Sequence, residues 1–155
     1  MRIVSLSALL ASTLLAPAAL GAQGVHPGEA RYGVWRMQSE APPPASNVMT
    51  YAPWGNGGMQ ITVESTNGEG VSSAWGYATL FDGRFRPVDG QEEAETAVTV
   101  VDDRTTRILN RRSGRLTTII LNTLSEDGDT IRNEYIRMGD DGPVGVSHAV
   151  YVRIR

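Results

Sequence analysis

Ser147 and His148, adjacent near the end of the chain, carry the two side chains that a serine hydrolase uses as nucleophile and base. The surrounding segment, "VSHAVYVRI", is rich in β-branched residues and predicts a strand. Because adjacent side chains on a strand point to opposite faces, these two cannot form the hydrogen bond that activates a nucleophile. The other histidine, His26, lies in a small, polar stretch far away in the sequence. We therefore assign no catalytic residue and expect a protein that is not an enzyme.

Three acidic stretches contain groups that metal ions bind. The last of them, "SEDGDT", lacks the alternating oxygen ligands of a calcium-binding loop. The chain has no cysteine and only two distant histidines, so it also lacks the usual zinc ligands. We expect solvated turns, no metal ion and no cofactor. The stretches contain Glu92, Glu93 and Glu95, then Asp102 and Asp103, then Glu126, Asp127 and Asp129.

Arginine side chains gather around one predicted hairpin, "RTTRILNRRSGR". Guanidinium groups bind carboxylates and phosphates, so this hairpin could contact an anion or a protein partner. The simpler interpretation is a charged surface hairpin, whose charges discourage pairing with foreign strand edges. The residues concerned are Arg104, Arg107, Arg111, Arg112 and Arg115.

Five aromatic residues are the candidates for contacts with an apolar ligand. Two of them belong to the proline- and glycine-rich stretch "YAPWGNGGM", where a loop could close over a ligand at the mouth of a cavity. The alternative is that Trp54 only caps the hydrophobic core. The candidate ligand contacts are Tyr51, Trp54, Trp75, Tyr77 and Phe81.

Strands of period two must position these side chains. The segment "GMQITVES" sends Met59, Ile61 and Val63 to one face. The stretch "SAWGYATLFDGRFRPVDG" predicts a hairpin that turns at Asp82-Gly83. Its bulky side chains share one face, and Gly76 leaves room where a curved sheet needs it. Further turns are predicted at Asn67-Gly68, Ser113-Gly114, Asp127-Gly128 and "GDDGP".

The fold class that follows is all-β. Eight to ten antiparallel strands without a helix to cover an edge are best accommodated in a single up-and-down barrel, because closure removes exposed edges. We expect the first strand, Gly33 to Met37, to pair with the last, His148 to Arg155. A two-sheet β-sandwich is the alternative.

The beginning of the sequence predicts a secretory signal peptide. Arg2 is followed by the short apolar run "IVSLSALLASTLLAPAAL" and then by small residues, which places cleavage near Gln23. We therefore expect a signal peptide over residues 1–22, a flexible mature N-terminus over residues 23–31 and one barrel domain over residues 32–155. A lipoprotein would need a cysteine after the cleavage site, so the mature protein should be released into the periplasm or secreted, without membrane insertion.

The charge composition indicates which kinds of binding partner are disfavoured. Fourteen arginines stand against seventeen acidic residues, which gives a net charge of -3 with the histidines neutral. This mildly acidic balance provides no general attraction to nucleic acid or to anionic membranes.

The sequence resembles two related groups of barrels. "GVW", from Gly33 to Trp35, is similar to the G-x-W of lipocalins, in which the Trp plugs one barrel end and an Arg of the last strand covers its ring; Arg153 or Arg155 would take that part. More of the chain resembles small exported bacterial proteins that are described as lipocalin-like and whose function is unassigned. The shared pattern is Gly33 and Trp35, Pro42 to Pro44, Tyr51 and Pro53, Gly57-Gly58, Thr62-Val63, Tyr77-Ala78, Asp82-Gly83, and Pro87-Val88 with Gly90.

These resemblances imply a fold and a compartment but no activity. We expect a non-enzymatic exported barrel that binds a small apolar or amphipathic ligand. The alternative is a barrel filled by its own side chains, which would act as a structural or protein-interaction module of the cell envelope. An eight-stranded barrel has room for side chains or for one small ligand, so the size of the interior decides between them.

Overall fold

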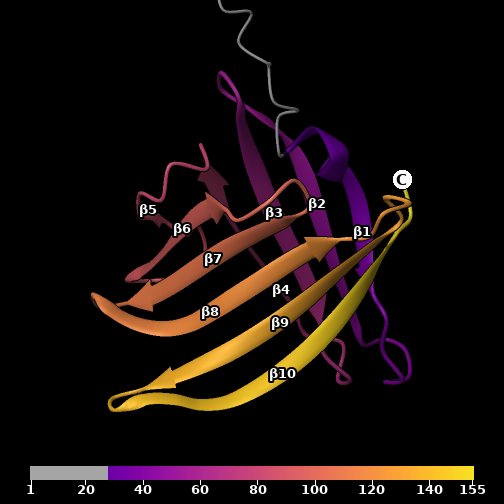
Figure 1. Cartoon of the computed structure of the whole chain (residues 1–155). Coiled ribbons are helices and arrows are strands. Elements are labelled where there is room, and N and C mark those ends of the chain that lie inside the picture. Colours follow the sequence, from indigo (N-terminus) through magenta and orange to yellow (C-terminus); the bar gives the residue numbers. More distant parts are fainter. Residues whose placement is uncertain (1–27) are drawn as a thin grey trace, which may run out of the picture.

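The computed structural model describes residues 28–155, which form ten strands and one short 3-10 helix (Figure 1). The helix η1 spans Glu29–Arg31. The first five strands are β1 (Gly33–Met37), β2 (Ser46–Trp54), β3 (Gly58–Thr66), β4 (Ser72–Thr79) and β5 (Arg86–Pro87). The others are β6 (Ala94–Val100), β7 (Thr105–Arg112), β8 (Arg115–Leu124), β9 (Thr130–Gly139) and β10 (Gly142–Arg153).

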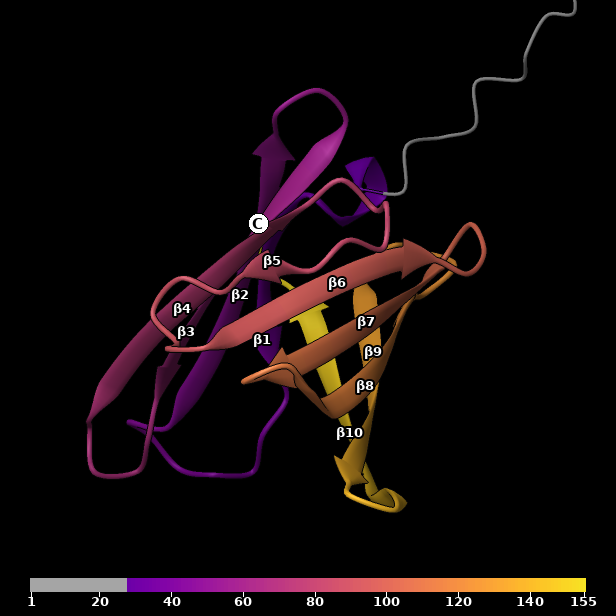
Figure 2. The ribbon, with the colours of Figure 1, turned by 90° about the vertical axis from the view of Figure 1, so that its left-hand side faces the viewer.

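All ten strands belong to one antiparallel sheet, in the order β4-β3-β2-β1-β10-β9-β8-β7-β6-β5. The first strand pairs with the last, and Trp35 lies opposite Arg153 in that ladder. The sheet curls into a nearly closed up-and-down barrel (Figures 1 and 2). The predicted barrel and the pairing of its first and last strands are confirmed, and the single sheet excludes the sandwich.

The barrel is incompletely closed where β4 meets β5 and β6. Two isolated bridges join the two sides: Gly76 and Asp89 exchange backbone hydrogen bonds of 3.1 and 2.8 Å, and Asp82, after β4, pairs with Thr99 of β6. Glycine is required on both sides of this seam, because a Cβ at Gly76 or at Gly90 would lie within 2.7 Å of a backbone carbonyl oxygen. The regular hairpin predicted over residues 73–90 is therefore wrong, because β4 and β5 are the two end strands in the order of the sheet.

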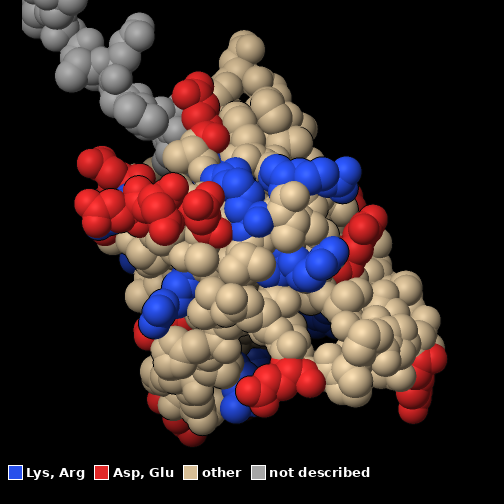
Figure 3. Space-filling model, turned by 90° about the vertical axis from the view of Figure 1, so that its right-hand side faces the viewer, with Lys and Arg blue, Asp and Glu red and all other residues tan. Residues whose placement is uncertain are grey.

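The two ends of the barrel differ. One end contains η1 and the buried Trp35, which donates to the Arg31 carbonyl, and the β7–β8 and β9–β10 turns lie away from this end (Figure 1). Seen from the side of β1 and the C-terminus, the surface is hollowed toward the lower end, and acidic side chains gather toward the upper end (Figure 3).

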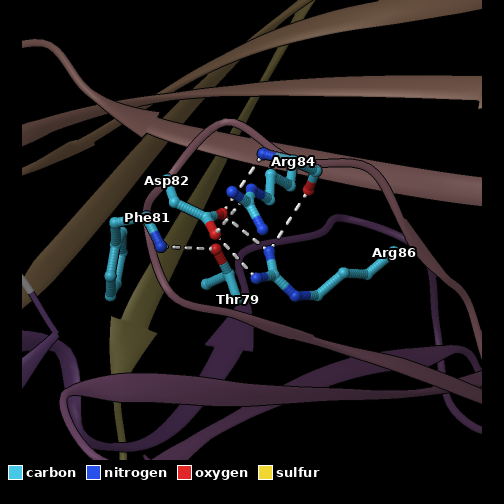
Figure 4. Close-up of polar contacts among 5 residues, drawn as sticks. All are labelled: Thr79, Phe81, Asp82, Arg84 and Arg86. Carbon is cyan, nitrogen blue, oxygen red and sulfur yellow. Dashed lines mark hydrogen bonds and ion pairs between the residues drawn. The ribbon is translucent and has the colours of Figure 1, made fainter.

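A compact set of polar contacts shapes the connection after β4 (Figure 4). The Phe81 amide donates to the Thr79 hydroxyl at 2.9 Å, and Phe81 has a φ of 57°. Both terminal nitrogens of Arg86 donate to the carboxylate of Asp82 at 2.8 Å. These hydrogen bonds hold the pKa of Asp82 well below its usual range. The chain turns at Asp82 and Gly83 as predicted, but it runs into a loop before the two residues of β5.

The inward face of the sheet follows the predicted alternation. Met59, Ile61 and Val63 are all buried, as are Met49 and Tyr51 on the neighbouring strand. Among the predicted turns, Ser113 and Gly114 both have positive φ values, of 49° and 77°, which suits a two-residue hairpin between β7 and β8.

The start of the folded part differs from the prediction. Residues 23–31 were expected to be a flexible N-terminus, but Glu29–Arg31 form η1 and the Arg31 side chain is only 1% exposed. The barrel therefore includes Glu29–Arg31, which were expected to belong to the flexible N-terminus. Arg31 is held because its side chain donates hydrogen bonds to acceptors inside the barrel. The predicted signal peptide and His26 lie outside the described residues. Within residues 28–155, no helix is long and apolar enough to cross a membrane.

Candidate functional site

The floor of the barrel is built on Trp35. This ring is fully buried, and the guanidinium carbon of Arg153 lies 4.1 Å from the ring centroid. Arg153 is held there by backbone carbonyls, because it donates to Tyr32 at 2.6 Å, to Ala30 at 2.8 Å and to Gly128 at 2.8 Å. Of the two arginines predicted to cover the ring, Arg153 does so. Arg155 is exposed, and its carbonyl oxygen accepts the Val34 amide.

Gly33 is required beside this floor by its backbone conformation. Its φ is 138°, and a Cβ there would lie 2.4 Å from the carbonyl oxygen of Arg155. The Gly and Trp of the "GVW" motif thus have separate roles: the Gly lets the residues after β10 approach, and the Trp fills the barrel end.

Arg31 completes the floor from η1. Its Nε donates to Oδ1 of Asn122 at 3.1 Å, and a terminal nitrogen donates to the Arg104 carbonyl. Its own carbonyl accepts the indole N–H of Trp35 at 2.9 Å. Burial lowers the pKa of Arg31.

Above this floor lies an interior cavity of about 300 Å³. Its walls combine aliphatic and aromatic carbon with tyrosine hydroxyls and side-chain amides, which is the usual lining of a small-molecule pocket. The lining residues from β2 to β4 are Asn47, Met49, Tyr51, Ile61, Val63, Trp75 and Tyr77. Those from β7 to β10 are Ile108, Asn110, Thr118, Ile120, Asn133, Tyr135 and Tyr151.

A chain of hydrogen bonds runs from the floor into this cavity. The Asn122 amide donates to Oδ1 of Asn133 at 2.8 Å and to the Tyr51 hydroxyl at 3.3 Å. The Asn133 amide donates in turn to the Tyr135 hydroxyl at 3.0 Å. Burial raises the pKa of Tyr51 to about 12, although the positive charge of Arg31 acts in the opposite direction. Burial therefore keeps Tyr51 neutral, and the hydrogen bonds fix the positions of the polar groups of the wall.

Tyr77 is the exception in this polar wall. It is 6% exposed, lines the cavity and stacks on Trp75 with ring centroids 6.2 Å apart. Within residues 28–155, its hydroxyl makes no hydrogen bond to another protein group. Burial raises its pKa well above the usual value. A neutral phenol with unused hydrogen-bonding capacity therefore faces the cavity.

The structure separates the five predicted ligand contacts. Tyr51, Trp75 and Tyr77 line the cavity. Trp54 ends β2 and is 40% exposed, so it neither closes over the cavity nor caps the core. Phe81 packs against the core but does not line the cavity. The polar lining residues from β7 to β10 were missed, although the alternation of Asn133 and Tyr135 with the charged residues Arg132 and Glu134 was a usable signal.

A second cavity, of about 280 Å³, opens beside the first at the ends of β6, β7 and β8. It shares Trp75, Asn110 and Thr118 with the interior cavity. The predicted arginine hairpin supplies two of its walls, Arg111 and Arg112. Arg111 donates to Glu95 at 2.7 Å and lies 3.9 Å from the ring centroid of Phe85.

The other chemical candidates remain apart. His148 lies 3.2 Å from a carboxylate oxygen of Glu134 on the outer face, and Ser147 belongs to the opposite face of β10. In the part of the chain that the structure describes, no three metal-binding side chains gather into a site.

The fold and the cavity define a small up-and-down β-barrel of the kind to which lipocalins and fatty-acid-binding proteins belong. No family model matches the chain, and no curated protein matches it. Solved structures do match. A Schistosoma mansoni fatty acid binding protein in complex with arachidonic acid has a TM-score of 0.60 at 12% identity, over 83% of this chain and 98% of that one. The wild-type fluorescent protein UnaG has a TM-score of 0.55 at 13% identity, over 79% and 96% of the two chains. At such identities the likeness shows the fold alone.

Proposed function

We propose that this protein is a non-enzymatic carrier that holds one small apolar or amphipathic molecule inside its barrel. The observation that carries the proposal is the interior cavity of about 300 Å³, whose wall presents the unused hydroxyl of Tyr77 among apolar side chains. Its volume falls at the lower end of the range for small-molecule sites. A ten-stranded barrel is also wider than one of eight strands, so its own side chains need not fill it.

The cavity favours the carrier over the filled barrel that was the alternative expectation. One structural neighbour is a fatty acid binding protein with a bound lipid, which supports the same class of ligand. Ser147 and His148 lie on opposite faces of β10, and among residues 28–155 no three metal-binding side chains gather into a site.

A blocked cavity tests the proposal. Thr118 lies at the junction of the two cavities, so a Thr118→Trp side chain should occupy the space of a ligand. We expect the neutral dye N-phenylnaphthylamine to bind the unmodified protein in a saturable manner, with a fluorescence increase. The variant should bind it at least about tenfold more weakly, a change of about 1.4 kcal/mol.

The matched control is Thr123→Trp, because Thr123 is an exposed threonine on the same strand. It should bind the dye as the unmodified protein does. Near-ultraviolet circular dichroism reports whether each variant is folded, and Thr118→Phe replaces Thr118→Trp if the larger side chain prevents folding. Equal dye binding by the blocked and unmodified proteins would show that the dye lies elsewhere, and the carrier proposal would fail.

We also propose that the carrier is exported and that residues 1–22 are removed. The support is the sequence alone: Arg2, the apolar run and the small residues before Gln23. We expect the intact mass of the protein, measured after expression in a bacterium that exports it, to match a chain that begins near Gln23. A mass that includes Met1 or Arg2 would contradict export through a cleaved signal.

A further inference from the structure

The two cavities adjoin and differ in chemical character. Trp75, Asn110 and Thr118 line both, so these three side chains form the boundary between the barrel interior and the second cavity. The interior part is bounded mainly by tyrosine, isoleucine, valine and methionine side chains. The outer part is lined by charged and polar side chains at the ends of β6, β7 and β8, together with Trp75, Val88 and Ala94.

The outer part is lined by one guanidinium, that of Arg112, which forms no ion pair within residues 28–155. Glu95 pairs with Arg111 at 2.7 Å, and the ion pair lowers the pKa of Glu95 and raises that of Arg111. Arg112 donates only to the neutral Gln91 amide oxygen, at 3.4 Å, and within residues 28–155 it forms no ion pair. The nearby Glu93 carboxylate accepts the hydroxyl of Ser113.

Neutral donors lie between this charge and the interior. Oδ1 of Asn110 accepts the Thr96 hydroxyl at 2.8 Å. The N–H groups of the Asn110 amide are therefore not used in this bond and can donate to a ligand. Thr118 lies opposite Asn110 across the β7–β8 ladder and lines both cavities. An acceptor group of a ligand would find the Asn110 amide, the Thr118 hydroxyl and the Arg112 guanidinium in succession.

From this arrangement we propose that the ligand is an amphipathic anion, which binds with its apolar body in the barrel and its anionic group at Arg112. The inference rests on the proposed carrier function and specifies its ligand class and orientation. An anionic group in the interior would lose its hydration among largely apolar walls, which is costly without a paired charge. At the outer cavity the same group keeps water on one side and gains charge-assisted hydrogen bonds from the guanidinium.

Two dyes with the same aromatic skeleton test this orientation. N-phenylnaphthylamine is neutral, and anilinonaphthalene sulfonate adds one anionic group. We expect Arg112→Gln to raise the dissociation constant of the sulfonate dye about three- to tenfold and to leave that of the neutral dye unchanged. Arg112→Glu should weaken the sulfonate dye further, because it adds a repelling charge. The matched control is Arg107→Gln, since Arg107 is exposed on the same strand and lines neither cavity.

The outcomes separate this inference from the carrier proposal. If the neutral dye does not bind, or if Thr118→Trp does not affect it, the carrier proposal fails. If the neutral dye binds in the cavity but Arg112→Gln leaves the sulfonate dye unchanged, or weakens both dyes equally, the assigned orientation is overturned. Selective weakening of the sulfonate dye by Tyr77→Phe, without an effect of Arg112→Gln, would also overturn it, because the anionic group would then lie deep in the barrel.

Discussion

Replacing Trp35 with alanine is expected to lower the free energy of unfolding by about 3 to 5 kcal/mol, the range for a buried tryptophan. The indole is fully buried, donates to the Arg31 carbonyl and lies under the Arg153 guanidinium. Its loss would leave a void at this end of the barrel and remove the surface on which Arg153 rests. Folded domains are stable by only about 5 to 15 kcal/mol, and this chain has no disulfide to compensate.

Denaturant unfolding followed by circular dichroism measures this effect, with Trp54→Ala as the control. Trp54 is also a tryptophan in a strand, but it is 40% exposed, so its replacement should cost less than about 1 kcal/mol. A stable Trp35→Ala protein, with a loss no larger than that of Trp54→Ala, would contradict the role of Trp35 as the floor of the barrel.

Replacing Arg31 with alanine is expected to cost about 2 to 4 kcal/mol. Two effects combine, because the variant leaves a void at a buried site and removes the donor to Oδ1 of Asn122. Burying the charged guanidinium costs free energy in the unmodified protein, and the variant avoids that cost. This gain opposes the two losses, so the expected loss of unfolding free energy is smaller than that of Trp35→Ala. The Asn122 amide would also become less well fixed, which should loosen its bonds to Asn133 and Tyr51.

A second variant of Arg31 separates the polar part of this loss from the loss of volume, and a variant of Arg36 is the control. Arg31→Met keeps much of the side-chain volume, so its smaller loss of unfolding free energy measures the polar part alone. Arg36→Ala is the control, since Arg36 is exposed on the neighbouring strand and should change stability by less than about 0.5 kcal/mol. If Arg31→Ala is as stable as Arg36→Ala, η1 is not an integral part of the floor.

The local pattern of the sequence determined the strands and most of their turns. Alternation in "GMQITVES" placed Met59, Ile61 and Val63 inside, and Ser113-Gly114 adopts the positive φ values that a two-residue hairpin needs. These features depend on neighbours one or two residues apart, so composition and period were enough to predict them. The pairing of the first strand with the last followed from edge protection and from the "GVW" and "YVRIR" segments, and it too is present.

Contacts between residues far apart in the sequence decided the positions of Arg31 and Trp54 and the existence of the cavity. Arg31 looked like part of a polar tail, but its partners Asn122 and Arg104 are distant in sequence and meet it only in the closed barrel. Trp54 shares the aromatic character of Trp75, yet the register places Trp54 at a rim and Trp75 on the cavity wall. The cavity itself depends on how completely side chains from seven strands fill the interior, and only their simultaneous packing sets that volume. The sequence alone therefore determined the strands and their inward faces, whereas the tertiary structure decided that the barrel is hollow and that Arg112 lines its outer cavity.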